Sequence, residues 1–358
     1  MRRFIILTLF LLVAGCYRGL RQTYTIKAHS NKSSALSHPV DLLWQSKLKA
    51  YPNQVINLND SLLLIGDSRG GVTTLNKNTG ERGDRYWRPF KRPIQLYGLL
   101  DSVLYFSSET EKNIVAWDLK NAVQLWKIKF NVDYNQMLSI DSLLYLASDS
   151  SVAMISATLG VQFRAIQLDE KLARGIAHAK NKIYICSESG ELQEFDRNLQ
   201  STDNKDLNIQ MVKAILLQGE RLLLYNSRGS VRIVALNNST IEFSKDFGAN
   251  LYAAPRLVND LLIVPFATGQ VSAYSLNDAT QKWSFFTESL LNLDLLVANE
   301  SIIIAYARGQ VVSIDVKTGL ERWRYDHGQS LDFAALTRQG VLLGHRKEIG
   351  FLGEKHEN

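Results

Sequence analysis

The feature that most constrains this chain is a repeat of about 40 residues that runs through most of its length. Each repeat contains a short polar turn followed by runs of Val, Ile, Leu and aromatic residues, which read as antiparallel strands. The turns stand at Asp60, Asp101, Asp141, Asn181, Glu220, Asp260, Glu300 and Gly340, spaced by 41, 40, 40, 39, 40, 40 and 40 residues. A period of roughly 40–45 residues with four strands per unit is typical of the blades of a β-propeller.

Two further markers recur in phase with the polar turn. Glycine follows it by nine or ten residues, where a hairpin turn needs a positive φ, at Gly70, Gly190, Gly229, Gly269 and Gly309. An aromatic residue follows it by 22 to 25 residues, at Trp126, Phe163, Phe243, Trp283 and Trp323. We expect Trp126, Trp283 and Trp323 to lie on last strands and to wedge between adjacent blades. The fourth unit lacks an aromatic residue in Leu199–Leu207, and we expect an irregular strand there.

The two ends of the repeat region complement each other. Leu42–Lys47, with Trp44, matches the last strand of a unit but comes first, whereas the final unit offers Val341–Leu343 and Ile349–Leu352 and then stops. The chain has 358 residues, of which 46% are hydrophobic, which suits a globular body. The sequence therefore predicts an all-β fold over residues 41–358. We expect an eight-bladed β-propeller of four-stranded antiparallel blades, closed by the N-terminal strand in the last blade.

The first 40 residues read as a leader and a tether. Residues 1–15 carry Arg2 and Arg3 and then an apolar stretch too short to span a membrane, which predicts a secretory signal. The segment Leu12–Cys16 resembles a bacterial lipobox, which implies cleavage before Cys16 and acylation of that residue. Residues 16–40 are predicted to form a flexible tether. Tyr17 follows the cysteine, and the absence of an Asp there favours the outer membrane over the inner one.

Charge and residue usage argue against several classes of function. The formal charge of +6 falls to +4 without Arg2 and Arg3, so we expect no nucleic-acid partner. Cys186 is left without a disulfide partner once Cys16 is lipidated, and we expect a buried, inert thiol. The six histidines are scattered, and no metal-ligand spacing or catalytic triad stands out. We therefore predict no cofactor, no metal and no enzymatic activity.

Three segments resemble the PQQ-type propeller repeat, whose core reads A-x-D-x-x-T-G-x-x-x-W. They are Ala116–Trp126, Tyr274–Trp283 and Ile314–Trp323. Eight such repeats behind a lipoprotein signal resemble the BamB family, a non-enzymatic scaffold in the machine that inserts β-barrels into the outer membrane. The resemblance implies protein partners bound through loops on one face, including the BamA subunit. The family's charged segment E-I-D-R-L-x-D-x-D has no counterpart here, since Phe247–Pro255 reads FGANLYAAP, so no binding residue is carried over.

The residues offer one candidate docking surface of their own. Glu81–Pro93, interpreted as the connection between the first two blades, is rich in Arg and aromatic residues, which are favoured at interface hot spots. Strand parity puts first-to-second and third-to-fourth turns on one face, and second-to-third turns and blade connections on the other. The candidate partner-binding residues are Arg69, Arg82, Arg85, Trp87, Arg88, Arg92, Arg228 and Arg308. The alternative is a solvated loop in which Trp87 packs on its neighbour.

The sequence thus predicts a lipid-anchored scaffold of the outer membrane, with its propeller in the periplasm, that binds protein partners in β-barrel assembly. Two alternatives stay open. One is a propeller lipoprotein of another envelope or secretion complex. The other is a sensor for a sugar or quinone, or a quinoprotein enzyme, that uses the central channel.

Overall fold

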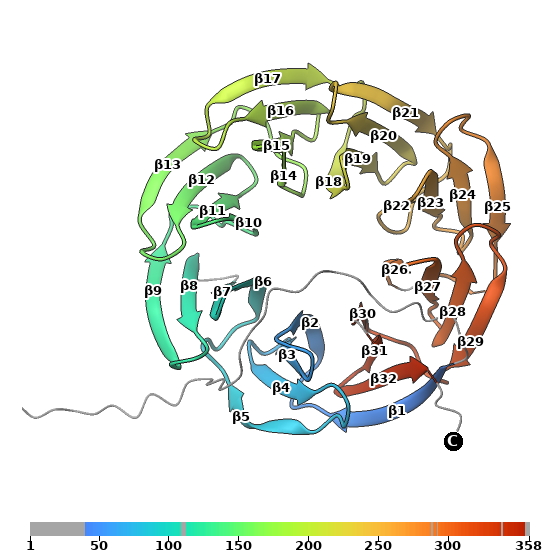
Figure 1. Ribbon diagram of the computed structural model, residues 1–358, viewed down its shortest axis with the longest axis horizontal. Coiled ribbons are helices and arrows are strands. Elements are labelled where there is room, and N and C mark those ends of the chain that lie inside the picture. Colours follow the sequence, from blue (N-terminus) through green and yellow to red (C-terminus); the bar gives the residue numbers. More distant parts are fainter. Residues whose placement is uncertain (1–39, 109–111, 288, 292, 338, 355–358) are drawn as a thin grey trace, which may run out of the picture.

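A computed structural model describes residues 40–354 except 109–111, 288, 292 and 338. These residues form 32 β-strands and no helix, arranged as eight four-stranded sheets around a central opening (Figure 1). The predicted eight-bladed propeller is confirmed. In this part of the chain no helix is long and apolar enough to cross a membrane. The predicted signal and tether lie outside the described residues, apart from Val40 at the start of the first strand.

Each blade adds its strands from the centre outward, with the first strand of a repeat innermost (Figure 1). The innermost strands are β2 (Pro52–Asn57), β6 (Ile94–Leu100), β10 (Gln136–Ile140), β14 (Ala177–Ala179), β18 (Val212–Gln218), β22 (Arg256–Val258), β26 (Leu296–Ala298) and β30 (Phe333–Leu336). The second strands are β3 (Leu62–Asp67), β7 (Val103–Ser108), β11 (Leu143–Ala147), β15 (Lys182–Cys186), β19 (Arg221–Asn226), β23 (Leu261–Pro265), β27 (Ser301–Ala305) and β31 (Gly340–His345).

The third and fourth strands complete the blades. The third strands are β4 (Val72–Asn76), β8 (Asn113–Asp118), β12 (Ser151–Ser156), β16 (Glu191–Phe195), β20 (Ser230–Ala235), β24 (Val271–Ser275), β28 (Gln310–Asp315) and β32 (Glu348–Glu354). The outermost strands are β5 (Arg82–Trp87), β9 (Val123–Lys129), β13 (Gln162–Gln167), β17 (Ser201–Asp206), β21 (Thr240–Asp246), β25 (Gln281–Phe285), β29 (Glu321–Asp326) and β1 (Val40–Lys47).

The N-terminal strand closes the ring, as predicted. β1 pairs antiparallel with β32, so the eighth blade has the order β30-β31-β32-β1. Trp44 lies opposite Phe351 and stacks on it, with 5.6 Å between ring centroids. Its Nε1 donates to the carbonyl of Lys77 in the first blade at 2.5 Å. One outer strand thus joins both ends of the propeller.

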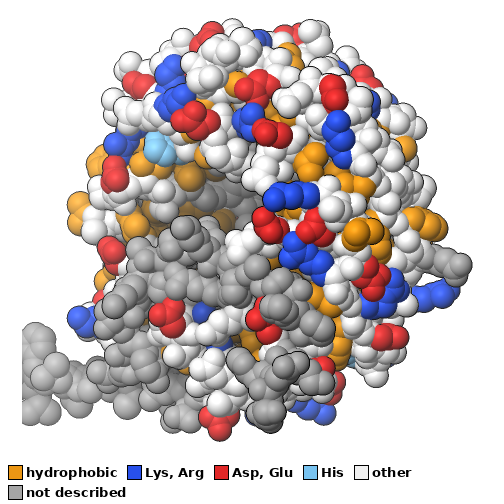
Figure 2. Space-filling view, turned by 45° about the vertical axis from the view of Figure 1, so that its right-hand side comes forward, with side chains coloured by type: hydrophobic (Ala, Val, Ile, Leu, Met, Phe, Trp, Pro, Cys, Tyr) orange, Lys and Arg blue, Asp and Glu red, His pale blue; other side chains and the backbone are white. Residues whose placement is uncertain are grey.

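The core lies between the blades rather than inside a single layer. Second strands are apolar on both faces because each sheet packs against a neighbour on either side. Leu222, Leu223 and Leu224 on β19, for example, are all fully buried. The buried residues form eight apolar clusters, and each cluster joins two adjacent blades. Figure 2 shows the central opening as a hollow with hydrophobic side chains in part of its wall.

The tryptophan of the repeat locks one blade to the next. Trp283 on β25 donates from Nε1 to the carbonyl of Val316 in the following blade at 2.8 Å, and Trp126 makes the equivalent bond to Ala157 at 2.9 Å. Gly319 turns against the indole of Trp283, and a Cβ on that glycine would lie 2.6 Å from the ring. The Thr318–Gly319 turn of one repeat therefore makes room for the tryptophan of the repeat before it.

The aromatic marker of the third repeat behaves differently from the tryptophans. Phe163 on β13 is 57% exposed and does not enter the seam between blades. The register explains this, because Trp126 pairs with Ala116, whereas in the next blade Arg164 takes the corresponding place opposite Met154. Phe163 lies between Gln162, which pairs with Ile155, and Arg164, which pairs with Met154. It has no partner on β12 itself and is exposed.

The fourth blade also differs from expectation. Its last strand, β17, pairs with β16 at five positions and has one register irregularity, between Glu194 and Phe195. The outer-strand pairs of the other blades have one as well, so β17 is no more irregular than they are. An outermost strand needs apolar residues only where it meets a seam, and the seam between blades four and five is filled here by buried Leu192, Leu207 and Ile209. Lys205 also reaches the next blade, where its Nζ donates to the carbonyl of Ser239 at 2.6 Å.

Backbone hydrogen bonds sort the loops into two faces, as strand parity predicts. The third-to-fourth turn of blade five bonds to its first-to-second turn, from Leu236 N to Glu220 O at 3.0 Å; we call this side the turn face. The connection that leaves blade five bonds to its second-to-third turn, from Phe247 N to Gly229 O at 3.0 Å; we call this side the connection face. A Cβ on Gly229 would lie 2.3 Å from the carbonyl oxygen of Ala249, so this turn requires glycine.

Candidate functional site

Four of the predicted arginines lie on the connection face. Arg69, Arg228 and Arg308 occupy second-to-third turns, and Arg92 lies in the connection between blades one and two; all four are exposed. The carboxylate of Asp67 shapes the first of these turns by accepting from the backbone N–H groups of Arg69 at 2.8 Å and of Gly71 at 2.9 Å. These cations are spread over three blades rather than gathered at one point.

The segment predicted as a single connection, residues 81–93, is divided in the structure. Residues 82–87 form β5, because they pair with β4, and only residues 88–93 cross to the second blade. Arg82 lies opposite Leu75 at the start of β5, toward the turn face and away from Arg69. The side chain of Arg85 lies outside the described residues.

Trp87 lies in the core between the first two blades. It is 8% exposed, and its ring centroid is 4.5 Å from that of Trp117 and 5.4 Å, edge-on, from that of Phe106. Trp87 is therefore a packing residue, which agrees with the alternative interpretation that it packs on its neighbour.

Arg88 holds the connection against the neighbouring turn. Its Nε donates to the carbonyl of Arg69 at 2.8 Å, and its Nη2 donates to the carbonyl of Lys91 at 2.7 Å. Gly70 makes the close approach possible, since a Cβ there would lie 1.9 Å from the carbonyl oxygen of Arg92. The connection is therefore fixed in place while the Arg88 side chain stays exposed.

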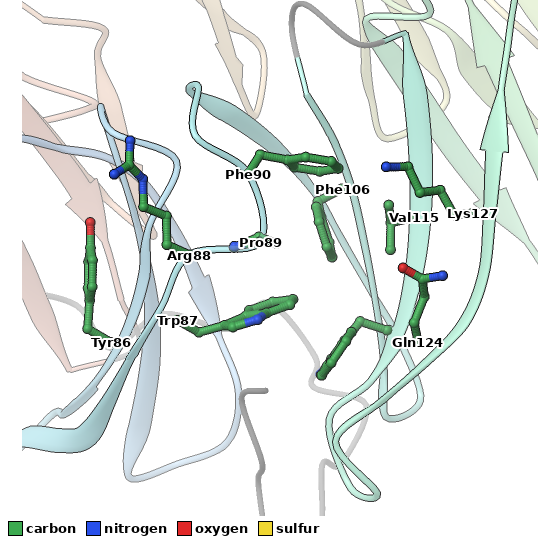
Figure 3. A pocket seen from close by; sticks show the side chains of 10 residues that line it. Tyr86, Trp87, Arg88, Pro89, Phe90, Phe106, Val115, Gln124 and Lys127 are labelled. Carbon is green, nitrogen blue, oxygen red and sulfur yellow. The ribbon is translucent and has the colours of Figure 1, made fainter. Parts of the chain in front are cut away.

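A pocket of about 340 Å³ opens in the seam between blades one and two (Figure 3). We call it the seam pocket. The residues lining it are Tyr86, Trp87, Arg88, Pro89, Phe90, Phe106, Val115, Trp117, Gln124 and Lys127. It forms where the repeat departs from its pattern. In blades two, six and seven a tryptophan of the outer strand stands opposite Ala116, Ala273 and Ser313, respectively, whereas the outer strand of blade one has no aromatic residue before Tyr86.

The rim of the seam pocket combines aromatic and cationic groups. Lys127 Nζ lies 4.9 Å from the ring centroid of Phe90, within the range of a cation–π interaction. Burial, with the Asp67 carboxylate nearby, raises the pKa of Tyr86 to about 12, so its phenol is neutral at physiological pH. Arg88 and Lys127 are the two charged residues among the described ones that line the pocket.

Sequence reasoning missed a set of exposed apolar residues on the connection face. They lie in the connections that lead into blades five, six and seven, and are Met211 (58% exposed), Tyr252 (40%), Phe286 (59%) and Leu290 (59%). The signal that could have found them is the presence of large apolar residues in connections, where hairpin chemistry does not require them.

The acidic turns on the opposite face are engaged by cations. Arg197 pairs with Asp141 at 2.5 Å, and Lys317 pairs with Glu300 at 3.4 Å. Lys180 lies 3.6 Å from Glu220. These ion pairs reduce the negative field of the turn face.

Groups suited to catalysis or metal binding are not gathered in the described part of the chain. Burial raises the pKa of Cys186 to about 12, which keeps its thiol protonated. Among residues 40–354, outside the gaps named above, no group of three or more His, Cys, Asp or Glu is placed to hold a metal ion.

Comparisons with known proteins agree with the propeller fold. The family model for the outer membrane protein assembly factor BamB matches residues 211–338, a stretch that contains β18 to β30. None of the curated proteins matches this chain in sequence.

Solved structures with the same architecture come from several functional classes. BamB from Moraxella catarrhalis is 12% identical, with a TM-score of 0.69 over 88% of this chain and 99% of that one. Saccharomyces cerevisiae Sqt1 is 11% identical, with a TM-score of 0.71 over 89% and 100%. The quinohemoprotein alcohol dehydrogenase ADHIIG from Pseudomonas putida HK5 is 10% identical, with a TM-score of 0.68 over 92% and 80%.

Identities this low show the fold alone, since one fold hosts many functions. The family-model match adds a resemblance in sequence, and it supports a protein-interaction scaffold in general. The chain is an eight-bladed β-propeller of PQQ-like repeats that resembles the outer membrane protein assembly factor BamB family.

Proposed function

We propose that this protein is a lipid-anchored, non-catalytic scaffold in outer-membrane β-barrel assembly. It is anchored through Cys16 and binds a partner protein with its connection face. The observation that carries the proposal is the exposed apolar set Met211, Tyr252, Phe286 and Leu290, which lies within the segment matched by the BamB family model.

The composition of this face suits protein binding. Aromatic residues, Met and Arg are enriched in interfaces, whereas Lys, Glu and Asp are depleted there. The connection face offers Tyr252 and Phe286 together with Arg228 and Arg308. By contrast, the turn face offers acidic residues that are already paired with cations.

Rigidity of the ring favours binding. The Trp283–Val316 and Trp126–Ala157 hydrogen bonds fix adjacent blades, and β1 joins the last blade to the first. Connections held in this way lose little conformational entropy when they bind a partner.

The anchor is consistent with this arrangement. Two or more acyl chains on Cys16 would hold the protein firmly at a bilayer. A flexible tether of some twenty residues has an average reach of roughly 25–30 Å, which leaves the propeller close to the membrane surface.

The test places acidic residues on the proposed interface. The Tyr252→Asp/Leu290→Asp variant is compared with Leu320→Asp, a matched control because Leu320 is 68% exposed but lies in a third-to-fourth turn on the turn face. Tagged full-length protein is purified from envelopes in mild detergent, and co-purifying proteins are quantified by mass spectrometry. We expect a β-barrel assembly subunit with wild type and with the control, and at least about tenfold less with the double variant. Enrichment of a different envelope complex would refute the assembly role.

A further inference from the structure

We propose that the seam pocket binds an aromatic side chain carried on an acidic, extended segment of a partner protein. This inference rests on the proposed function as a protein-binding scaffold and gives that role a second contact point. The pocket lies on the outer side of blades one and two, away from the apolar set of blades five to seven (Figure 1, Figure 3).

The interior of the pocket is suited to an aromatic ring. Its apolar lining is made by Trp87, Phe90 and Trp117, together with Phe106 and Val115, which at 1% and 2% exposed present little surface of their own. A cavity of about 150 Å³ can already hold benzene. The seam pocket, at about 340 Å³, has room for a phenyl ring and part of the backbone that carries it.

The seam has space because β5 has no tryptophan at the register position that Trp126, Trp283 and Trp323 occupy in their blades. Between blades six and seven that residue is Trp283, which is 8% exposed and bonded to Val316 across the seam. Between blades one and two, Trp87 and Trp117 fill part of the space, and the remainder is the pocket. An aromatic side chain from a partner would replace the missing contact.

The charge of the rim selects the segment that carries the aromatic residue. Arg88 and Lys127 are exposed, and both are cations. Lys127 is positioned by its cation–π contact with Phe90, and Arg88 by its bonds to the carbonyls of Arg69 and Lys91. Fixed cations beside an apolar pocket favour carboxylates on either side of the inserted ring.

The surface beside the pocket favours a polypeptide. Gln124 lines the pocket from β9, and its side-chain amide can both donate to and accept from a backbone. An extended segment could therefore pair its backbone with this amide.

The test uses three synthetic peptides with the full chain purified in detergent. The probe is a seven-residue fluorescein-labelled peptide with a central phenylalanine flanked by aspartates and glutamates. One control peptide replaces phenylalanine with alanine, and the other replaces the acids with lysines. By fluorescence anisotropy we expect the alanine and lysine peptides to bind at least about tenfold more weakly than the probe.

Variants locate the binding on the protein. Lys127→Glu should weaken binding of the probe by at least about tenfold. Lys120 is another exposed lysine, at the turn face, and Lys120→Glu should change binding of the probe by less than about twofold. Gln124→Glu provides a second rim variant if Lys127→Glu fails to fold, as judged by circular dichroism.

The outcomes separate this inference from the proposed function. No binding of the probe to wild type, equal binding of the phenylalanine and alanine peptides, or unchanged binding in both rim variants would overturn the seam-pocket proposal. None of these results would alter co-purification through Tyr252 and Leu290. Loss of that co-purification with retained peptide binding would overturn the assembly role alone.

Discussion

Replacing Trp283 with alanine should lower the free energy of unfolding by about 3–5 kcal/mol. The side chain is 8% exposed, and its indole packs on Gly319 of the next blade. A buried aromatic side chain removes roughly 150–250 Å² from water, which at about 25 cal/mol per Å² gives about 4–6 kcal/mol as an upper estimate. Its loss would also leave the carbonyl of Val316 without its partner, at about 1 kcal/mol or more.

The assay is equilibrium unfolding in urea followed by circular dichroism, which does not depend on the fluorescence of the deleted residue. Phe163→Ala is the matched control, because Phe163 has nearly the same spacing in its repeat, 22 rather than 23 residues after the polar turn, but is 57% exposed. We expect that control to change stability by less than about 0.5 kcal/mol. Trp283→Phe, which keeps a ring but removes the N–H, should fall between the two.

The reasoning about seam locks would be refuted if Trp283→Ala cost less than about 1 kcal/mol, or if it matched Phe163→Ala. Either result would mean that the aromatic marker of the repeat does not join neighbouring blades.

Three further predictions follow from individual residues. Burial alone would raise the pKa of Asp315, but hydrogen bonds from Arg322 and from the turn that follows lower this pKa to about 2. The ionised carboxylate should therefore stabilise the fold fully above about pH 4, and this stabilisation should be lost as the pH falls through 2. Asp315→Asn should therefore cost about 2 kcal/mol at pH 7 and little at pH 2, as measured by urea unfolding at both pH values. Cys186, whose pKa burial raises to about 12, should resist Ellman's reagent at pH 8 in a Cys16→Ser background and react after unfolding. Gly229→Ala should lower the thermal midpoint by several degrees, because φ is +98° there and the added Cβ would meet a carbonyl oxygen at 2.3 Å.

The number of blades and the closure of the ring could be predicted from sequence because both depend on spacing. Each polar turn ends an innermost strand, so counting turns counts blades. Trp44 stands before any first strand, which leaves the last blade as its place, and β1 pairs there with β32.

Individual aromatics were harder to place because their direction depends on local register. Phe163 has the spacing of a wedge, but the strand irregularity between Met154 and Ile155 puts Arg164 in that position. The charged sequence of residues 82–87 resembles a loop, yet it pairs with β4, since an outermost strand tolerates polar residues on its solvent side.

The seam pocket could not be predicted because it depends on contacts between blades. Trp87 and Trp117 are 30 residues apart and meet only when the two sheets pack. The outer strand of blade one has no tryptophan at the position that Trp126, Trp283 and Trp323 occupy in their strands, but the resulting space depends on how far neighbouring side chains fill the seam.

The central claim is that the connection face contacts a β-barrel assembly subunit, and site-specific photocrosslinking in living cells tests it most directly. A photoreactive amino acid is placed at Tyr252, which is 40% exposed, and, as a control on the turn face, at Leu320, which is 68% exposed and so no less accessible to a partner. The account predicts a crosslink from position 252 to a subunit of the β-barrel assembly machinery and none from position 320. Crosslinks to that subunit from position 320 alone, or to none of its subunits from position 252, would contradict it.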